Sequence, residues 1–156
     1  MKAERRVEVR WQGNLAGGNG VVTTATSGQL EGQRVSWPGR TLEPDGETSP
    51  EELIAAAHAS CFAMALSGAL EKSGITPRHL DVTAVVTFEK NAHGWSIVSS
   101  HLEVLGSVPG VDEVAFAAIA NTAKDDCPVS RALKGNIEIT IEAMLSAENL
   151  AAAAGP

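Results

Sequence analysis

The sequence of 156 residues lacks several features that would place it in a common functional class. It has no basic patch, and its 12 Lys and Arg against 19 Asp and Glu give a formal net charge of −7. Phosphate backbones and anionic lipid surfaces attract positive charge, so neither nucleic acid nor an anionic membrane is expected as a general partner. The N-terminal MKAERRVEVRW has basic residues without a following apolar segment. It is therefore not expected to be a secretory signal.

Long hydrophobic runs and cysteines are also scarce. The most apolar stretch contains Glu51, Glu52, His58 and Ser60, so we expect it to fall short of the roughly 18 apolar residues of a membrane span. The expected compartment is the cytoplasm. There, the two cysteines would be reduced at rest, and a pair of this kind is either redox-active or simply two inert buried thiols.

The composition that remains is typical of a globular protein, with 44% hydrophobic and 20% charged residues. We expect a single domain over residues 1–146 and an Ala-rich C-terminal tail over residues 147–156, which could extend as a frayed helix. No internal repeat is present.

Residue patterns predict strands separated by two helical regions. Alternating or β-branched segments predict strands at 5–11, 21–26, around 33–37, 82–90, 95–106 and 136–145. Helices are predicted at 50–72, at about 113–125 and just after residue 127, and residues 38–49 are predicted to form a loop. This order has no β-α-β alternation, so the expected fold class is α+β with antiparallel sheets.

The helix predicted at 50–72 carries strong boundary signals. Ser49 is suited to cap its N-terminus, Pro50 to occupy its first position and Ser73-Gly74 to end it. Its middle is apolar nearly all round, which is typical of a helix covered on every side. We expect a sheet against one side and a second copy of the same helix against another.

Two thiols are candidates for chemistry. Cys127 precedes Pro128 at a predicted helix N-terminus, where the helix dipole stabilises a thiolate, although the charges of Asp125 and Asp126 oppose this effect. Cys61 lies in the middle of the apolar helix, where burial should raise its pKa and leave it inert. It could act as a nucleophile only if a fixed cation reached it from elsewhere.

Three arginines could supply that cation: Arg34, Arg40 and Arg131. Arg40 is the best placed to fold over the helix, and arginine can bind a carboxylate through two hydrogen bonds while remaining charged. Glu51 lies ten residues before Cys61, about 15 Å along one helix. If both act at one site, Glu51 would come from a second chain, as a two-fold dimer allows; otherwise it only complements the helix dipole.

His58 lies one turn before Cys61, but side chains three apart on a helix seldom align for proton transfer. One histidine and two cysteines supply too few ligands for a metal site. The other histidines, His79, His93 and His101, occupy predicted helix-exit, turn and strand positions and are expected to be solvated or structural. No metal or other cofactor is expected.

Two motifs, SPEELIAAAHASCFAMAL (49–66) and CPVSRAL (127–133), closely resemble the OsmC/Ohr family of bacterial peroxidases, the osmotically inducible and organic-hydroperoxide-resistance proteins. The resemblance extends from the first hairpin to the strand ending near residue 144. The Ohr branch carries an arginine in that hairpin, whereas the present sequence has AGGNG there and so resembles the OsmC branch.

The resemblance implies an intertwined homodimer whose strands wrap around two long central helices, with active sites at the interface. It implies that Cys61 is the peroxidatic cysteine, Cys127 the resolving cysteine and Glu51 the partner of the catalytic arginine. That arginine would be Arg40, with Arg34 as the alternative. The implied substrates are an organic hydroperoxide and, more weakly, hydrogen peroxide, and the implied reductant is a dithiol such as dihydrolipoamide.

The expected mechanism is attack by Cys61 on the peroxide bond, formation of a sulfenic acid and condensation with Cys127 to a disulfide. The apolar side chains of Leu53, Ile54, Phe62 and Met64 are expected to favour a hydroperoxide with a hydrocarbon tail. Two alternatives remain from the sequence: a thiol-based redox sensor or binding protein with little turnover, and a stress-related dimer with inert thiols.

Overall fold

The computed structural model describes residues 1–147 and residue 149. These residues form two compact units, one over residues 1–53 and the other from residue 54 onward. The single domain predicted over residues 1–146 stays a prediction. The predicted tail, residues 147–156, lies almost entirely outside the described residues.

The first unit contains a three-stranded antiparallel sheet of β1 (Val7–Gln12), β2 (Asn19–Ala25) and β3 (Arg34–Ser36), in that order. All three strands were predicted. The alternation of Val7, Val9 and Trp11 along β1 is typical of a half-buried strand, but all six of its residues are exposed in the single chain. Its large hydrophobic side chains are 41–55% exposed: Val7, Val9 and Trp11.

A short helix, α1 (Trp37–Thr41), follows β3 where a loop was predicted. The hydroxyl of Ser36 caps this helix by accepting a hydrogen bond from the backbone N–H of Gly39 at 3.0 Å, and Pro38 lies in the first turn. The prediction of a loop is wrong, because the Ser36 cap and Pro38 in the first turn start a helix there. Arg40 consequently lies on a helix.

The long helix α2 (Pro50–Lys72) has the predicted boundaries. At its start, the hydroxyl of Ser49 accepts a hydrogen bond from the backbone N–H of Glu52 at 3.1 Å. After its end, Gly74 adopts a φ of 74°, a left-handed conformation that favours glycine. The local signals in the sequence were therefore sufficient to define this element.

The second unit contains a sheet of β4 (His79–Asn91), β5 (Gly94–Ser107) and β6 (Glu138–Leu145), in that order. β4 and β5 form the predicted antiparallel hairpin, but β6 runs parallel to β5. The helices α3 (Glu113–Asp126) and α4 (Pro128–Leu133) lie between β5 and β6 in the chain and provide a crossover long enough for parallel pairing. The α+β class is confirmed, with this one difference from wholly antiparallel sheets.

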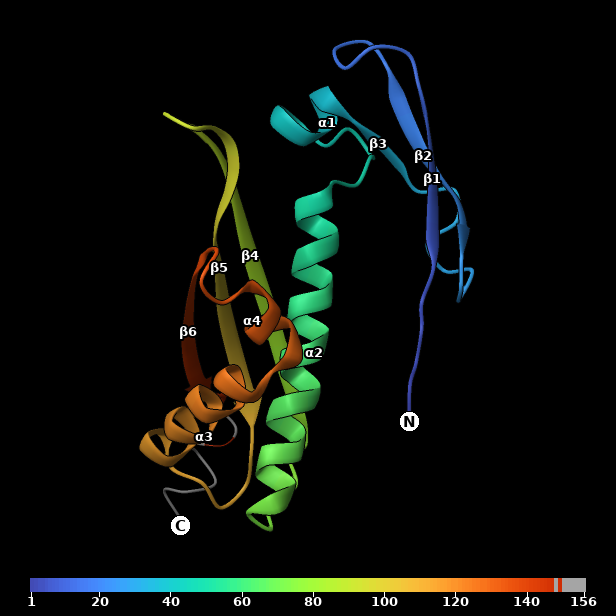
Figure 1. Cartoon of the computed structure of the whole chain (residues 1–156). Helices are drawn as coiled ribbons and strands as arrows, with labels where there is room; N and C mark the ends of the chain where they lie inside the picture. Colours follow the sequence, from blue (N-terminus) through green and yellow to red (C-terminus); the bar gives the residue numbers. More distant parts are fainter. Residues whose placement is uncertain (148, 150–156) are drawn as a thin grey trace. The chain divides into compact units, whose positions relative to one another are not determined.

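The core of the second unit is built between α2, the sheet and α3, which lie beside one another in Figure 1. One stripe of α2 enters this core, and side chains of β5 and α3 close it. Its fully buried large side chains are Phe62, Leu66, Leu70, Leu102, Val104, Val108 and Phe116. Cys127 is part of the same cluster.

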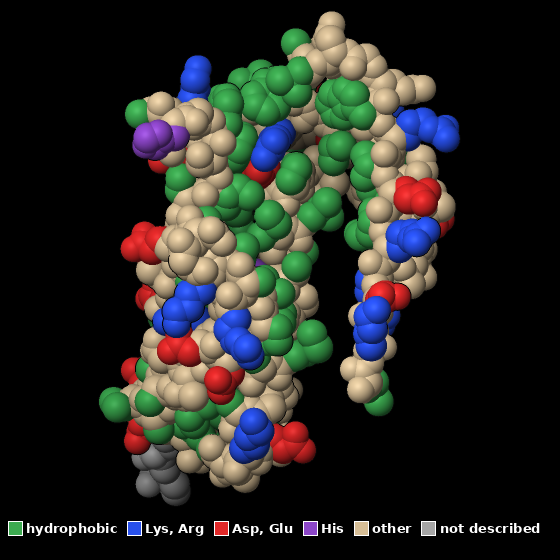
Figure 2. Space-filling view, viewed as in Figure 1, with side chains coloured by type: hydrophobic (Ala, Val, Ile, Leu, Met, Phe, Trp, Pro, Cys, Tyr) green, Lys and Arg blue, Asp and Glu red, His purple; other side chains and the backbone are tan. Residues whose placement is uncertain are grey.

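The remaining surface of α2 is apolar and uncovered in the single chain. Most of its apolar stretch is not buried, and Met64 is 69% exposed. Hydrophobic side chains are accordingly visible on the surface in Figure 2. By length and mean hydropathy (1.7), α2 could cross a membrane, so the expectation that its polar residues exclude this was too strict. Core helices meet the same criteria, and α2 supplies part of the core.

Candidate functional site: a pair of thiols and an arginine–glutamate pair

The two cysteines, far apart in the sequence, are neighbours in the second unit. Cys61 lies on α2 and is partly exposed, whereas Cys127 immediately precedes α4 and is buried. Both are free thiols, and their side chains are within hydrogen-bonding reach of each other. The fold therefore brings together the two thiols that the sequence singled out.

Burial raises the pKa of the Cys61 thiol above its usual value of 9.0, and the hydrogen bond and charge of Cys127 act in the same direction. One contact opposes this shift: the backbone N–H of Val129, in the first turn of α4, hydrogen-bonds to the Cys61 sulfur and favours its thiolate. The N-terminus of α4 is thus directed at Cys61. The sequence had associated this helix terminus with Cys127 alone.

A buried polar network lies beside the thiols. The two ring nitrogens of His58 are hydrogen-bonded to the hydroxyl of Ser100 on β5, at 2.7 Å, and to that of Ser130 on α4, at 2.8 Å. His58 and Ser100 are wholly buried, and burial lowers the pKa of His58. The sequence suggested His58 only as a possible base for Cys61 or as a metal ligand, and it gave no sign of either serine, because their pairing depends on the tertiary fold.

Arg40 and Glu51 form an ion pair within the first unit. Nη2 of Arg40 donates to Oε1 of Glu51 at 2.6 Å, and Nε lies 3.2 and 3.1 Å from the two carboxylate oxygens. The guanidinium also lies over the ring of Trp37, 5.9 Å from its centroid. Glu51 is only 7% exposed. This is the pairing that the family resemblance implied.

Arg34, the alternative arginine, has a different environment. Its Nε lies 3.3 Å from Oε1 of Glu47, and its side chain is 62% exposed, against 27% for Arg40. A buried carboxylate that receives several hydrogen bonds holds a guanidinium in a fixed orientation, whereas an exposed pair does so weakly. The structure therefore distinguishes Arg40 as the better-ordered cation.

A groove of about 610 Å³ runs along the C-terminal half of α2, beside α3. It is lined by Met64, Ala65, Gly68 and Ala69 from α2, by Ile119 from α3 and by Pro128, next to Cys127. Of the side chains expected to form an apolar lining, Met64 is present here. Phe62 is wholly buried in the core instead, because it lies on the stripe of α2 that faces the sheet.

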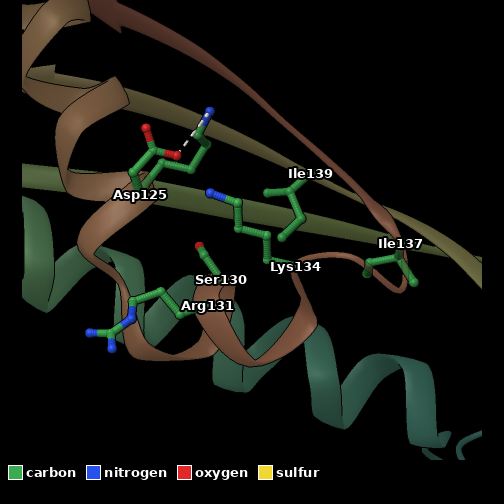
Figure 3. A pocket seen from close by; sticks show the side chains of 7 residues that line it. Asp125, Ser130, Arg131, Lys134, Ile137 and Ile139 are labelled. Carbon is green, nitrogen blue, oxygen red and sulfur yellow. Dashed lines mark ion pairs between the residues drawn. The ribbon is translucent and has the colours of Figure 1, made fainter.

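A second pocket, of about 220 Å³, lies between the end of α3, α4 and the start of β6 (Figure 3). Its charged lining consists of Lys124, Asp125, Arg131 and Lys134, with Ser130 at its inner wall. Lys124 pairs with Asp125 at 3.8 Å. Arg131, the third candidate cation from the sequence, is exposed here.

The remaining histidines, His79, His93 and His101, lie at exposed or half-buried positions. His79 lies near Asp81, and His101 is bound to Thr140. Within residues 1–147 and residue 149, no group of three or more His, Cys, Asp or Glu side chains is placed to hold a metal ion.

Comparison with known proteins identifies the family. The model of the family described as OsmC-like protein matches residues 43–142, and the chain belongs to this family. It is 41% identical over 145 residues to peroxiredoxin OsmC of Escherichia coli, covering 93% of this chain and 99% of that protein. It is also 30% identical over 95 residues to an organic hydroperoxide resistance protein of Xanthomonas axonopodis, covering 60% and 65% of the two chains.

A solved structure agrees with this assignment. The crystal structure of the organic hydroperoxide resistance protein OhrB of Bacillus subtilis superposes with a TM-score of 0.70 and 26% sequence identity. The match covers 88% of this chain and 97% of that chain. The α+β arrangement with a long central helix is therefore the OsmC/Ohr fold.

Proposed function

We propose that this protein is a thiol peroxidase that reduces organic hydroperoxides, and hydrogen peroxide more weakly, by a two-cysteine mechanism. The observation that carries the proposal is the contact between a partly exposed thiol, Cys61, and a buried one, Cys127. This asymmetry suits a first thiol that meets the substrate and a second that meets only the first. The relatives named as a peroxiredoxin and as organic hydroperoxide resistance proteins support the same activity.

The proposed reaction has three steps. The Cys61 thiolate attacks one oxygen of the hydroperoxide, the O–O bond breaks, and the departing alkoxide takes a proton to become an alcohol while Cys61 becomes a sulfenic acid. Cys127 then attacks the Cys61 sulfur, giving a disulfide and releasing water. Finally, an external dithiol, such as dihydrolipoamide, reduces the disulfide by two electrons and is itself oxidised to a disulfide.

Arg40 is proposed to supply the positive charge that the thiolate needs. Because burial raises the pKa of Cys61 and the Val129 N–H only partly opposes this, a further cation is required for reaction near neutral pH. Arg40 is held by Glu51, which starts α2 ten residues before Cys61, about 15 Å of helix rise. We therefore propose an intertwined homodimer in which Arg40 and Glu51 serve the thiol pair of the partner subunit.

The groove lined by Met64, Ala65 and Ile119 is proposed to receive the hydrocarbon tail of the substrate. It is mainly apolar, and its Pro128 adjoins Cys127. Burial of a hydrocarbon chain there would favour organic hydroperoxides over hydrogen peroxide by about 0.8 kcal/mol for each buried methylene. The proposed compartment is the cytoplasm, where a dithiol reductant can keep both cysteines reduced.

The test compares the wild type with Cys61→Ser and Cys127→Ser during turnover of cumene hydroperoxide with dihydrolipoamide. Wild type should turn over repeatedly, and Cys61→Ser should be inactive. Without added dithiol, Cys127→Ser should consume one equivalent of peroxide and stop as a Cys61 sulfenic acid that dimedone labels, whereas the wild type stops as a disulfide. Activity retained in Cys61→Ser would refute the proposal.

The second candidate is a redox sensor, favoured by the raised pKa of Cys61. It predicts a Cys61–Cys127 disulfide after one pulse of peroxide but no multiple turnover with any dithiol. Mass spectrometry after the pulse, combined with the turnover assay, separates the two candidates.

A further inference from the structure

His58 occupies a position that the proposed reaction does not use. It lies on α2 three residues before Cys61, while its partner Ser130 lies on α4 three residues after Cys127. Residues three apart on a helix share one face. The His58–Ser130 hydrogen bond and the Cys61–Cys127 contact are therefore two neighbouring links between the same pair of chain segments, one helical turn apart.

The second nitrogen of His58 fixes this link to the sheet. Ser100, its partner, lies on β5, the central strand, where it is paired with Val86 of β4 and Ile139 of β6. Strands bonded on both sides are the most rigid part of a sheet. His58 thus ties the first turn of α4 to α2 and to the centre of the sheet at once.

The chemistry of the network suits a permanent link. Burial lowers the pKa of His58, so its ring is neutral near pH 7 and has one donor and one acceptor nitrogen. A serine hydroxyl can donate or accept, so both hydrogen bonds are satisfied in either tautomer. Because Ser130 is only 4% exposed, water would replace the lost partner poorly if one bond were removed.

We propose that His58 is a positioning residue for disulfide formation, which holds the segment Cys127–Ser130 in register with α2 so that the Cys127 sulfur faces Cys61. The same register directs the Val129 N–H at the Cys61 sulfur. This inference rests on the proposed function, since the disulfide is the resolving step of that reaction. Its central measurement, however, requires no peroxide.

The experiment measures how readily the two thiols pair in mixtures of reduced and oxidised glutathione. Each oxidised glutathione takes two electrons from Cys61 and Cys127, yielding one protein disulfide and two reduced glutathiones. The equilibrium constant of this exchange gives the effective concentration of the Cys127 thiol experienced by Cys61. The variants are Ser130→Ala, which cuts the bond to α4, and Ser100→Ala, which cuts only the bond to the sheet. Ser130→Thr keeps a hydroxyl and serves as the rescue.

Ser130→Ala should lower the effective concentration roughly tenfold, and Ser130→Thr should restore most of it. Ser100→Ala removes an equivalent buried hydrogen bond and should lower stability comparably in urea, yet it should change the effective concentration by less than about threefold. A merely structural role would give equal effects for the two alanine variants. Equal effects, an unchanged Ser130→Ala, or a wild type that never forms the disulfide would each overturn the proposal.

A peroxide experiment then connects the link to the reaction. In Ser130→Ala, the Cys61 sulfenic acid should persist longer, so labelling by dimedone and over-oxidation to sulfinic acid should both increase relative to wild type and Ser100→Ala. If the protein proved not to be a peroxidase, no variant would consume peroxide, but the glutathione measurement would still show the difference between the two serines. The two failures are therefore distinguishable.

Discussion

Replacing Arg40 with methionine should destabilise the protein much more than the same change at Arg34. Methionine keeps an unbranched side chain but removes the charge. In the variant, the Glu51 carboxylate, whose side chain is only 9% exposed, loses a contact of 2.6 Å and two longer ones to Arg40. The comparison tests whether this ion pair is an ordered part of the site.

The expected magnitude follows from the burial of each partner. Removing one partner of a fully buried pair costs about 3–5 kcal/mol, whereas an exposed pair contributes about 0–1 kcal/mol. The Arg40 side chain is 27% exposed, so we expect a loss of about 2 kcal/mol. With a urea m value of about 2 kcal/mol per molar, the midpoint should fall by about 1 M.

Urea unfolding at one fixed protein concentration measures this change, because an oligomer would make stability depend on concentration. Arg34→Met is the control: its side chain is 62% exposed and makes one contact at 3.3 Å, so the loss should stay within about 0.5 kcal/mol. Adding Glu51→Leu to Arg40→Met should restore stability by removing the uncompensated buried charge. Equal losses at the two arginines, or no recovery in the double variant, would refute the reasoning.

Three further predictions concern the second unit. Burial lowers the pKa of His58 below 6.5, so His58 takes up its proton at a higher pH in the unfolded chain than in the folded one. The contribution of His58 to the free energy of unfolding should therefore be lost as the pH falls below 6.5. In urea titrations, His58→Gln should lack this pH dependence. In Arg40→Met, where the proposed cation is gone, alkylation of Cys61 should keep rising above pH 9, because burial raises its pKa; a plateau below pH 8 would contradict this. Gly106→Ala should cost about 1–3 kcal/mol in thermal unfolding, since the new Cβ would lie 2.6 Å from Cζ of Phe116.

Elements with local signals could be predicted from the sequence. The limits of α2 followed from Ser49, Pro50 and Gly74, whose effects act within one turn of the helix. The β4–β5 hairpin followed from alternation in two neighbouring segments. In contrast, the parallel pairing of β6 depends on where the α3–α4 crossover delivers the chain, and no residue of β6 itself encodes that direction.

The candidate site divides in the same way. Cys61, Cys127 and Glu51 were identified because two sequence motifs carry them, and Arg40 because it precedes the first motif and could fold over the helix. The links of His58 to Ser100 and Ser130 span 42 and 72 residues, and an isolated serine gives no sign of such a partner. From the sequence, Cys127 was also expected to be the more reactive thiol, because it precedes a helix N-terminus. In the fold, the N-terminus of that helix, α4, directs the Val129 N–H at Cys61.

The uncovered face of α2 provides a test of the proposed dimer. A helix that is apolar nearly all round is stable in water only if every side is covered, yet the single chain leaves Met64 69% exposed. In a monomer, Met64→Glu would replace one exposed side chain by another and change stability by less than about 0.5 kcal/mol. In the dimer, it would bury a carboxylate without a partner, which costs far more.

We therefore expect Met64→Glu to shift the protein from dimer to monomer in sedimentation equilibrium. Val114→Glu is the matched control, because Val114 on α3 is also highly exposed, at 82%, but does not belong to the α2 face. It should leave the mass unchanged. A wild type that sediments as a monomer, or a Met64→Glu variant that keeps the dimer mass at every concentration, would show that a second copy does not cover α2. The proposed sharing of Arg40 and Glu51 between subunits would then fail as well.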